Sequence, residues 1–226
     1  MDALTWHHLL TAAPAPSPAP RSGLPDAARG DYALDVAVWF GVESFDSPLV
    51  ENLTADMTLR IEANRRSPSG AKEILALDGP FGVGKTSLIR ELARLHYPTY
   101  APRIDTEVMP TWTPEPGVTH DHVPIMWVQL QAGSTLKILY TAQLDFLRFP
   151  LHGTSGLLAS RALRALSRAG VQLLVLDDVH KLRETQQASR DIIDALHTIN
   201  TTVGEAGGTL CLVGSELQRR TLLNHP

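Results

Sequence analysis

A glycine-rich loop constrains the fold of this chain more than any other stretch of its sequence. Its eight residues match the Walker A pattern: Gly79, Pro80, Phe81, Gly82, Val83, Gly84, Lys85 and Thr86. The apolar segment Ile74 to Leu77 precedes the loop, and a helical pattern from Thr86 to Leu95 follows it. In this context, glycines let successive backbone N–H groups and the positive end of the helix face a phosphate. The loop therefore predicts a nucleotide phosphate site in an α/β fold.

Three side chains at the end of the loop have distinct predicted roles. We expect Lys85 to reach the β- and γ-phosphates, Thr86 to ligate Mg²⁺, and Ser87 to lie beside the α-phosphate. A glycine-rich turn with a chance lysine is the alternative. The strand and the helix on the correct sides of the loop argue against that alternative.

Two adjacent carboxylates follow a second apolar run. Asp177 and Asp178 end the segment Leu173 to Leu176, which has the composition of a buried strand. The carboxyl ends of strands face the ligand crevice in an open α/β sheet, so this element is interpreted as Walker B. Asp177 is expected to hold Mg²⁺ through water, and Asp178 to orient or deprotonate the attacking water.

A third polar position ends the last apolar run of the chain. Ser215 follows Thr209 to Val213 and Gly214, and it is our candidate sensor of the γ-phosphate. A simple N-cap for a helix starting near Glu216 is an equally good interpretation of this serine.

Strand and helix patterns alternate along the rest of the chain. The expected strands are Ile74 to Leu77, Val123 to Leu130, Val171 to Leu176 and Thr209 to Val213. The expected helices are Thr86 to Leu95, Thr135 to Leu147, Leu157 to Ser167 and Thr185 to Val203. Alternation of this kind predicts an α/β P-loop NTPase whose mostly parallel sheet is flanked by helices. The proline-rich stretch Tyr97 to His122 is expected to be a long surface loop.

Composition divides the chain into three parts. Residues 1–30 are predicted to be a disordered tail rich in Ala and Pro, residues 31–70 an N-terminal helical segment, and residues 71–226 the P-loop core. The net charge of −4 gives no general attraction to nucleic acid. A single cysteine, Cys211, and the lack of a long apolar run favour a soluble, cytoplasmic protein with no membrane partner.

Several segments together resemble the transposition ATPases of the TniB and TnsC type, within the AAA+ class. They are GPFGVGKTSLIRELAR, VPIMWVQLQ, LLVLDDVHKLRETQQASRDIIDALHTIN and GTLCLVGSE, and the likeness extends from Ser47 to Leu223. The resemblance implies an ATPase that forms a homo-oligomer with ATP on DNA and directs a transposase to its target. It also implies that Lys85 and Thr86 bind nucleotide and Mg²⁺, that Asp177 binds the metal, that Asp178 takes the place of the catalytic acid, and that Ser215 is the sensor. The preference for ATP and ADP over guanine nucleotides comes from this resemblance.

The sequence departs from that family in two places. Glu is usual where Asp178 stands, and the shorter side chain predicts slow hydrolysis. The chain also stops after the fourth expected strand, so we expect the fifth strand and the helical lid to be absent and the Walker A strand to lie at a sheet edge. Two alternatives stay open: a STAND-type nucleotide switch in signalling or defence, which LLVLDDV also resembles, and a degenerate nucleotide-binding module.

Overall fold

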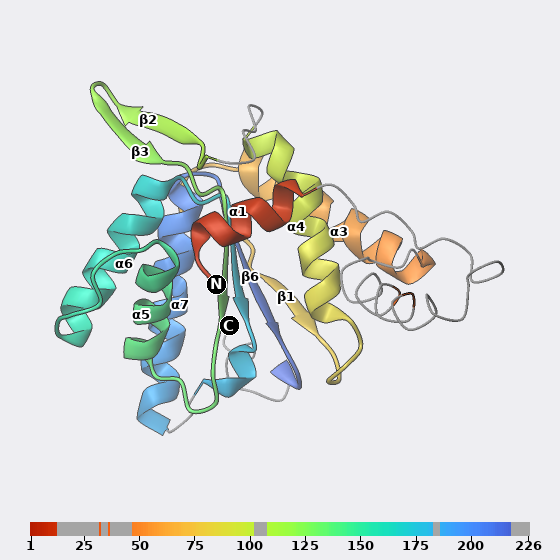
Figure 1. Cartoon of the computed structure of the whole chain (residues 1–226). Helices are drawn as coiled ribbons and strands as arrows, with labels where there is room; N and C mark the ends of the chain where they lie inside the picture. Colours follow the sequence, from red (N-terminus) through yellow and green to blue (C-terminus); the bar gives the residue numbers. More distant parts are fainter. Residues whose placement is uncertain (13–31, 33–35, 37–46, 102–107, 183–185, 218–226) are drawn as a thin grey trace.

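Four parallel strands form the centre of the fold (Figure 1). The computed structural model describes residues 1–12, 32, 36, 47–101, 108–182 and 186–217, without the side chains of residues 186–189. The strands are β1 (Leu75–Asp78), β4 (Ile125–Gln129), β5 (Leu173–Asp177) and β6 (Thr209–Gly214), and they lie in the order β1-β6-β5-β4. Every residue of β5 and β6 is buried, as expected for central strands covered on both faces.

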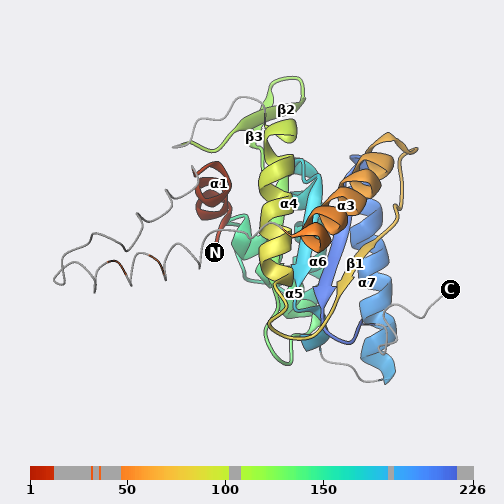
Figure 2. The same ribbon diagram turned by 90° about the vertical axis from the view of Figure 1, so that its right-hand side faces the viewer.

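Helices cover both faces of this sheet (Figures 1 and 2). One face carries α5 (Leu136–Phe146), α6 (Ser155–Ala169) and α7 (Gln186–Glu205). The other carries α1 (Ala3–Thr11), α3 (Pro48–Arg66) and α4 (Lys85–Tyr100). The three-layer arrangement confirms the predicted fold class, and the observed bounds of the four core strands differ from the expected ones by two residues or fewer.

The position of the Walker A strand also agrees with the sequence-based expectation. Within the described residues, β1 pairs only with β6, through a register that joins Leu75 to Cys211 and Asp78 to Gly214. The loop after β1 is therefore beside the end of β6, and β5 lies one strand further on.

The predicted surface loop from Tyr97 to His122 is wrong at both ends. Helix α4 continues through Pro98 to Tyr100, because the buried ring of Tyr97 fixes its last turn against the core. Further along, β2 (Thr111–Glu115) and β3 (Val118–Asp121) pair as an antiparallel hairpin. The indole N–H of Trp112 donates to the backbone carbonyl of Arg168 at 2.8 Å, which fastens this hairpin to the end of α6.

The predicted disordered tail is wrong over its first residues. Asp2 caps α1 by accepting a hydrogen bond from the backbone N–H of Thr5 at 2.9 Å. Trp6, His7 and Leu10 lie on the buried face of this helix and pack into the core. A capping aspartate followed by apolar residues at helical spacing could have predicted the helix. The Ala- and Pro-rich part of the predicted tail lies outside the described residues.

The helical segment predicted within residues 31–70 is represented by α3, capped by Ser47. None of the helices that the structure describes has the length and apolar character needed to cross a membrane.

Candidate nucleotide site

The loop between β1 and α4 offers its backbone to a ligand. Gly82 and Gly84 adopt left-handed conformations with φ of 80° and 86°, which side-chain-bearing residues adopt at a cost. Phe81 and Val83 point away into solvent, with 99% and 60% of their surface exposed. The backbone N–H groups in the first turn of α4 have no acceptor within the helix, so they can face an anion at this loop.

Lys85 is folded back over this loop. Its ammonium group donates to the carbonyl oxygens of Gly79 at 2.8 Å and Pro80 at 2.7 Å. These neutral acceptors hold the cation at the loop, where phosphate oxygens would be stronger acceptors for it. Ser87 lies exposed in the first turn of the same helix.

Thr86 and Asp177 meet across the site. The hydroxyl of Thr86 donates to a carboxylate oxygen of Asp177 at 3.3 Å. Burial, with Asp178 adding its negative charge, raises the pKa of Asp177, although hydrogen bonds from the Asp178 backbone, Thr86 and Trp127 oppose the rise. Asp177 is only 3% exposed. Hard oxygen donors of this kind suit Mg²⁺, and a buried carboxylate gains from a nearby cation. The donor set therefore fits Mg²⁺, and Thr86 and Asp177 are the side chains that would hold it.

Asp178 is engaged by three neighbouring side chains. Its backbone is left-handed, with φ of 61°. Lys181 donates to its carboxylate at 2.7 Å and Gln129 at 3.3 Å, and His180 Nδ1 lies 3.9 Å away. Burial alone would raise the pKa of Asp178, but the hydrogen bonds from Lys181 and Gln129 outweigh it and lower the pKa below the usual value. Asp178 is thus an anion that is already held in place.

Sequence reasoning missed Gln129 and Lys181. The register that aligns Gln129 with Asp177 carries this amide to the same sheet edge. The sequence signal for Gln129 is that it is a polar residue at the end of an apolar strand. Lys181 follows Asp178 by one turn of the short 3-10 helix Val179–Lys181, a spacing that permits the contact.

Ser215 lies at the end of β6, between the phosphate loop and the Walker B strand. Its backbone N–H donates to His180 Nδ1 at 3.3 Å, so the ends of β5 and β6 are connected through this imidazole. The helix for which Ser215 was considered as an N-cap falls largely outside the described residues. The structure thus brings Lys85, Thr86, Asp177, Asp178 and Ser215 to one edge of the sheet.

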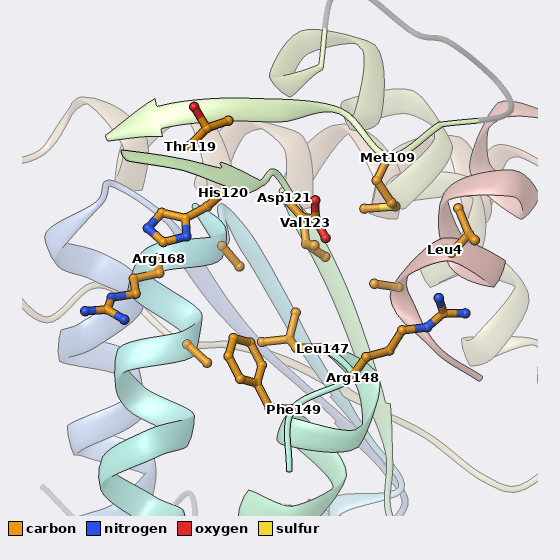
Figure 3. Close-up of a pocket in the computed structure, with 13 residues that line it drawn as sticks. Leu4, Met109, Thr119, His120, Asp121, Val123, Leu147, Arg148, Phe149 and Arg168 are labelled. Atoms are coloured by element: carbon orange, nitrogen blue, oxygen red, sulfur yellow. The ribbon is translucent and has the colours of Figure 1, made fainter. Parts of the chain in front are cut away.

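Two cavities flank β4. One, of about 410 Å³, starts at Thr86 and extends along the β4 edge beneath α1, with Arg90, Gln129 and Asp145 among its polar lining residues. The other has a volume of about 370 Å³, and Figure 3 shows Leu4 of α1, Leu147 and Phe149 among the residues that line it. Val123 in its wall precedes β4, so this second cavity is at the opposite end of the strands from the phosphate loop.

Within the described residues, no group of three or more His, Cys, Asp or Glu side chains is arranged to hold a metal ion. His122 packs its ring against Trp112 instead, with ring centroids 5.5 Å apart.

Comparison with known proteins agrees with this geometry. Residues 68–223 match the family model of the AAA domain. A search of curated proteins finds no significant match. Among solved structures, the crystal structure of Cdc6p from Pyrobaculum aerophilum is similar, with a TM-score of 0.54 and 17% identity. The alignment covers 80% of this chain and 42% of that one, so this chain spans less than half of the length of Cdc6p. On the strength of the family match over well more than half of its residues, this chain belongs to the AAA domain family of P-loop ATPases.

Proposed function

We propose that this protein is a Mg²⁺-ATP-dependent AAA+ regulator that hydrolyses ATP slowly, assembles on DNA as a homo-oligomer and directs a transposase to its target. The observation that carries the nucleotide part is the contact between Thr86 and Asp177 beside an open phosphate loop. Membership of the AAA family implies the use of nucleotide and Mg²⁺ in general.

Each residue of the site has a defined part in this proposal. Lys85 transfers its hydrogen bonds from the loop carbonyls to phosphate oxygens, and the backbone of the loop binds the remaining phosphate charge. Thr86 and Asp177 hold the metal, which neutralises charge on the phosphates when it is bound. Asp178 orients the attacking water, and Ser215 lies where it can contact the γ-phosphate.

The slow rate follows from the surroundings of Asp178. Its carboxylate is bonded to Lys181 and Gln129, and both contacts lower its basicity. A carboxylate with a depressed pKa is a weak base towards water, and the aspartate is one methylene shorter than the glutamate usual in related proteins. The protein would then act through whether nucleotide is bound, and fast turnover would not be needed.

The DNA and transposase parts of the proposal rest on the likeness of four sequence segments to the TniB and TnsC type. Two basic residues in the second half of α3 are already paired within the subunit. Arg60 pairs with Asp56 and Glu73, and Arg65 with Glu62, so their charges are compensated within the subunit.

A STAND-type nucleotide switch is the second candidate, and one observation favours it. Asp177 ends β5 and Asp178 follows it directly. Asp178 is paired with Lys181 and so is poorly suited to activate water. A protein with this site would retain its nucleotide tightly and exchange it rarely.

Nucleotide binding and turnover by the purified protein, with Mg²⁺ and with or without duplex DNA, test the proposal. Lys85→Ala should lose binding, and Asp178→Asn should bind without turnover. Wild-type turnover or assembly stimulated by DNA supports the transposition regulator. Tight nucleotide retention indifferent to DNA supports the switch. A wild-type protein that binds no nucleotide would refute both candidates.

A further inference from the structure

The cavity of about 410 Å³ along the β4 edge is separate from the phosphate loop. Thr86 is the one Walker A residue in its wall. Among the described residues, Asp177, Asp178 and Ser215 do not line it. Its wall comes instead from α1, α4, β4 and α5, which meet at this edge of the sheet (Figures 1 and 2). The cavity is therefore a neighbour of the nucleotide site with its own set of side chains.

Arg90 brings an unpaired positive charge to this cavity. It follows Thr86 by four residues on α4, so the two side chains share a face of the helix, and both line the cavity. Arg90 is partly buried, its Nε is buried without an acceptor, and its guanidinium has no ion pair within the part of the chain that the structure describes. A cation that has lost part of its hydration gains from an anionic partner. Arg90 therefore favours the negative group of a ligand.

Asp145 adds the opposite charge to the same wall. It lies exposed on α5, and its carboxylate forms no hydrogen bond or ion pair with any described residue, Arg90 included. The two charges thus line one cavity without neutralising each other. A ligand that carries both a negative and a positive group can bind both of them at once. The charges of the wall therefore fit a zwitterion.

The wall also offers apolar surface beside these charges. Its apolar side chains include Trp6, Leu9, Trp127 and Phe146. The N–H of Trp6 is buried and has no acceptor among the described residues, an unusual state for a donor that a bound water or ligand can relieve. The volume lies within the range of about 300–1,000 Å³ that is typical of small-ligand sites. A ligand that fits this wall needs an apolar body as well as its two charges.

We propose that this cavity binds a free α-amino acid with a large apolar side chain. The carboxylate of the ligand binds the guanidinium of Arg90, and its ammonium group binds Asp145. Its side chain packs against the apolar part of the wall, beside Trp6 and Trp127. The binding of this ligand goes beyond the proposed function and does not require a bound nucleotide.

Isothermal titration calorimetry of the whole nucleotide-free chain with L-phenylalanine, L-leucine and L-tryptophan tests the site. Two analogues of L-phenylalanine each lack one charge: 3-phenylpropanoate has no ammonium group, and 2-phenylethylamine has no carboxylate. We expect L-phenylalanine to bind about tenfold or more tightly than either analogue, because each analogue loses one charge-assisted contact. No binding of any of the three amino acids, or equal affinity for L-phenylalanine and 3-phenylpropanoate, would overturn the proposal.

Two variants assign the charges of the ligand to their partners. Arg90→Gln should weaken the binding of L-phenylalanine and 3-phenylpropanoate by about tenfold and leave that of 2-phenylethylamine unchanged. Asp145→Asn should weaken L-phenylalanine and 2-phenylethylamine and leave 3-phenylpropanoate unchanged. Arg94→Gln and Asp194→Asn are the matched controls, because Arg94 lies one turn further along α4, Asp194 lies on α7, and neither lines the cavity. Affinities in the two test variants equal to those of the controls would refute the assigned contacts.

Indole ¹⁵N–¹H NMR locates the ligand in wild-type protein. L-phenylalanine should shift the N–H peaks of Trp6 and Trp127, which line the cavity, and leave that of Trp112 in the hairpin in place. Each peak is identified by its loss in the corresponding Trp→Phe variant. Peaks of Trp6 and Trp127 that stay in place while the amino acid binds would show that it binds elsewhere.

A competition experiment separates this inference from the proposed function. Saturating Mg²⁺-ATP should not displace L-phenylalanine, because the two ligands have different binding residues. Displacement would mean that the cavity is part of the nucleotide site, and the proposal of a separate site would fail. A wild-type protein that binds the amino acid and no nucleotide would refute the proposed function and support this inference.

Discussion

Removing Lys181 should make Asp178 a better base and raise the turnover of ATP. In Lys181→Met the methionine keeps most of the aliphatic stem and loses the ammonium group that lies 2.7 Å from the carboxylate. The two side chains are 35% and 23% exposed, so solvent screens the pair substantially. We assign it about 1 kcal/mol, the upper end of the range for surface pairs. If the loss of this stabilisation lowers the activation free energy of hydrolysis by the same amount, turnover rises by about fivefold.

The same substitution has a signature in stability. Lys181 and Gln129 lower the pKa of Asp178 in the folded protein, so their contribution is present above the ordinary value of 3.8 and is lost as the pH falls through the lowered pKa. Lys181→Met should therefore be about 1 kcal/mol less stable than wild type at pH 7, and the difference should close below about pH 3.8.

Steady-state turnover at saturating Mg²⁺-ATP and thermal unfolding between pH 7 and pH 3 check both expectations. Lys137→Met is the control, because Lys137 lies exposed on α5. Turnover that falls tenfold or more in Lys181→Met, with nucleotide affinity unchanged, would refute the reasoning. It would mean that the ammonium group contributes its charge to the reaction directly.

Three further predictions concern the phosphate loop, the Walker B carboxylate and the buried cysteine. Gly84→Ala should destabilise the protein by about 1–2 kcal/mol in urea unfolding, because the φ of Gly84 is 86°. Gly156→Ala in α6, where an added methyl group meets nothing within 4 Å, should stabilise the protein by about 0.5–1 kcal/mol. Equal effects of the two substitutions would contradict the backbone strain expected at Gly84. Asp177→Asn should raise the melting temperature of nucleotide-free protein at pH 7 by roughly 2–4 °C, because burial and the charge of Asp178 raise the pKa of Asp177 and make its ionised form unfavourable. This gain in melting temperature should shrink as the pH falls towards 3.8. The same substitution should abolish the effect of Mg²⁺ on nucleotide binding. Cys211, whose pKa burial raises to about 12, should not react with a thiol reagent in native protein and should react at once in urea, and rapid native labelling would show that β6 opens.

The core of the fold and the main site residues could be predicted because each has a strong local pattern. Apolar runs locate β1, β4, β5 and β6, and the glycines of the phosphate loop fix where β1 ends and α4 begins. Parallel strands bring their carboxyl ends together, so Thr86, Asp177 and Ser215 were expected at one edge.

The errors arose where long-range packing decides the structure. Pro98 predicted a helix end, yet buried Tyr97 keeps the last turn of α4 in place. Helix α1 is too short to be stable alone, and it depends on Trp127 and Tyr97, which lie far away in the sequence. The partners of Asp178 were missed for the same reason, since Gln129 reaches it only through the strand register.

The pairing of β1 with β6 affects how the protein is made as well as what it binds. Leu75 pairs with Cys211, so the strand that leads into the phosphate loop leaves the ribosome long before the strand on which it rests. At about 5–20 residues per second, this delay is on the order of ten seconds. Contacts so distant in sequence form slowly, and until then the apolar strands are available to chaperones or to neighbouring nascent chains. A nucleotide that binds the folded state and not the unfolded one would stabilise the domain once this pairing has formed.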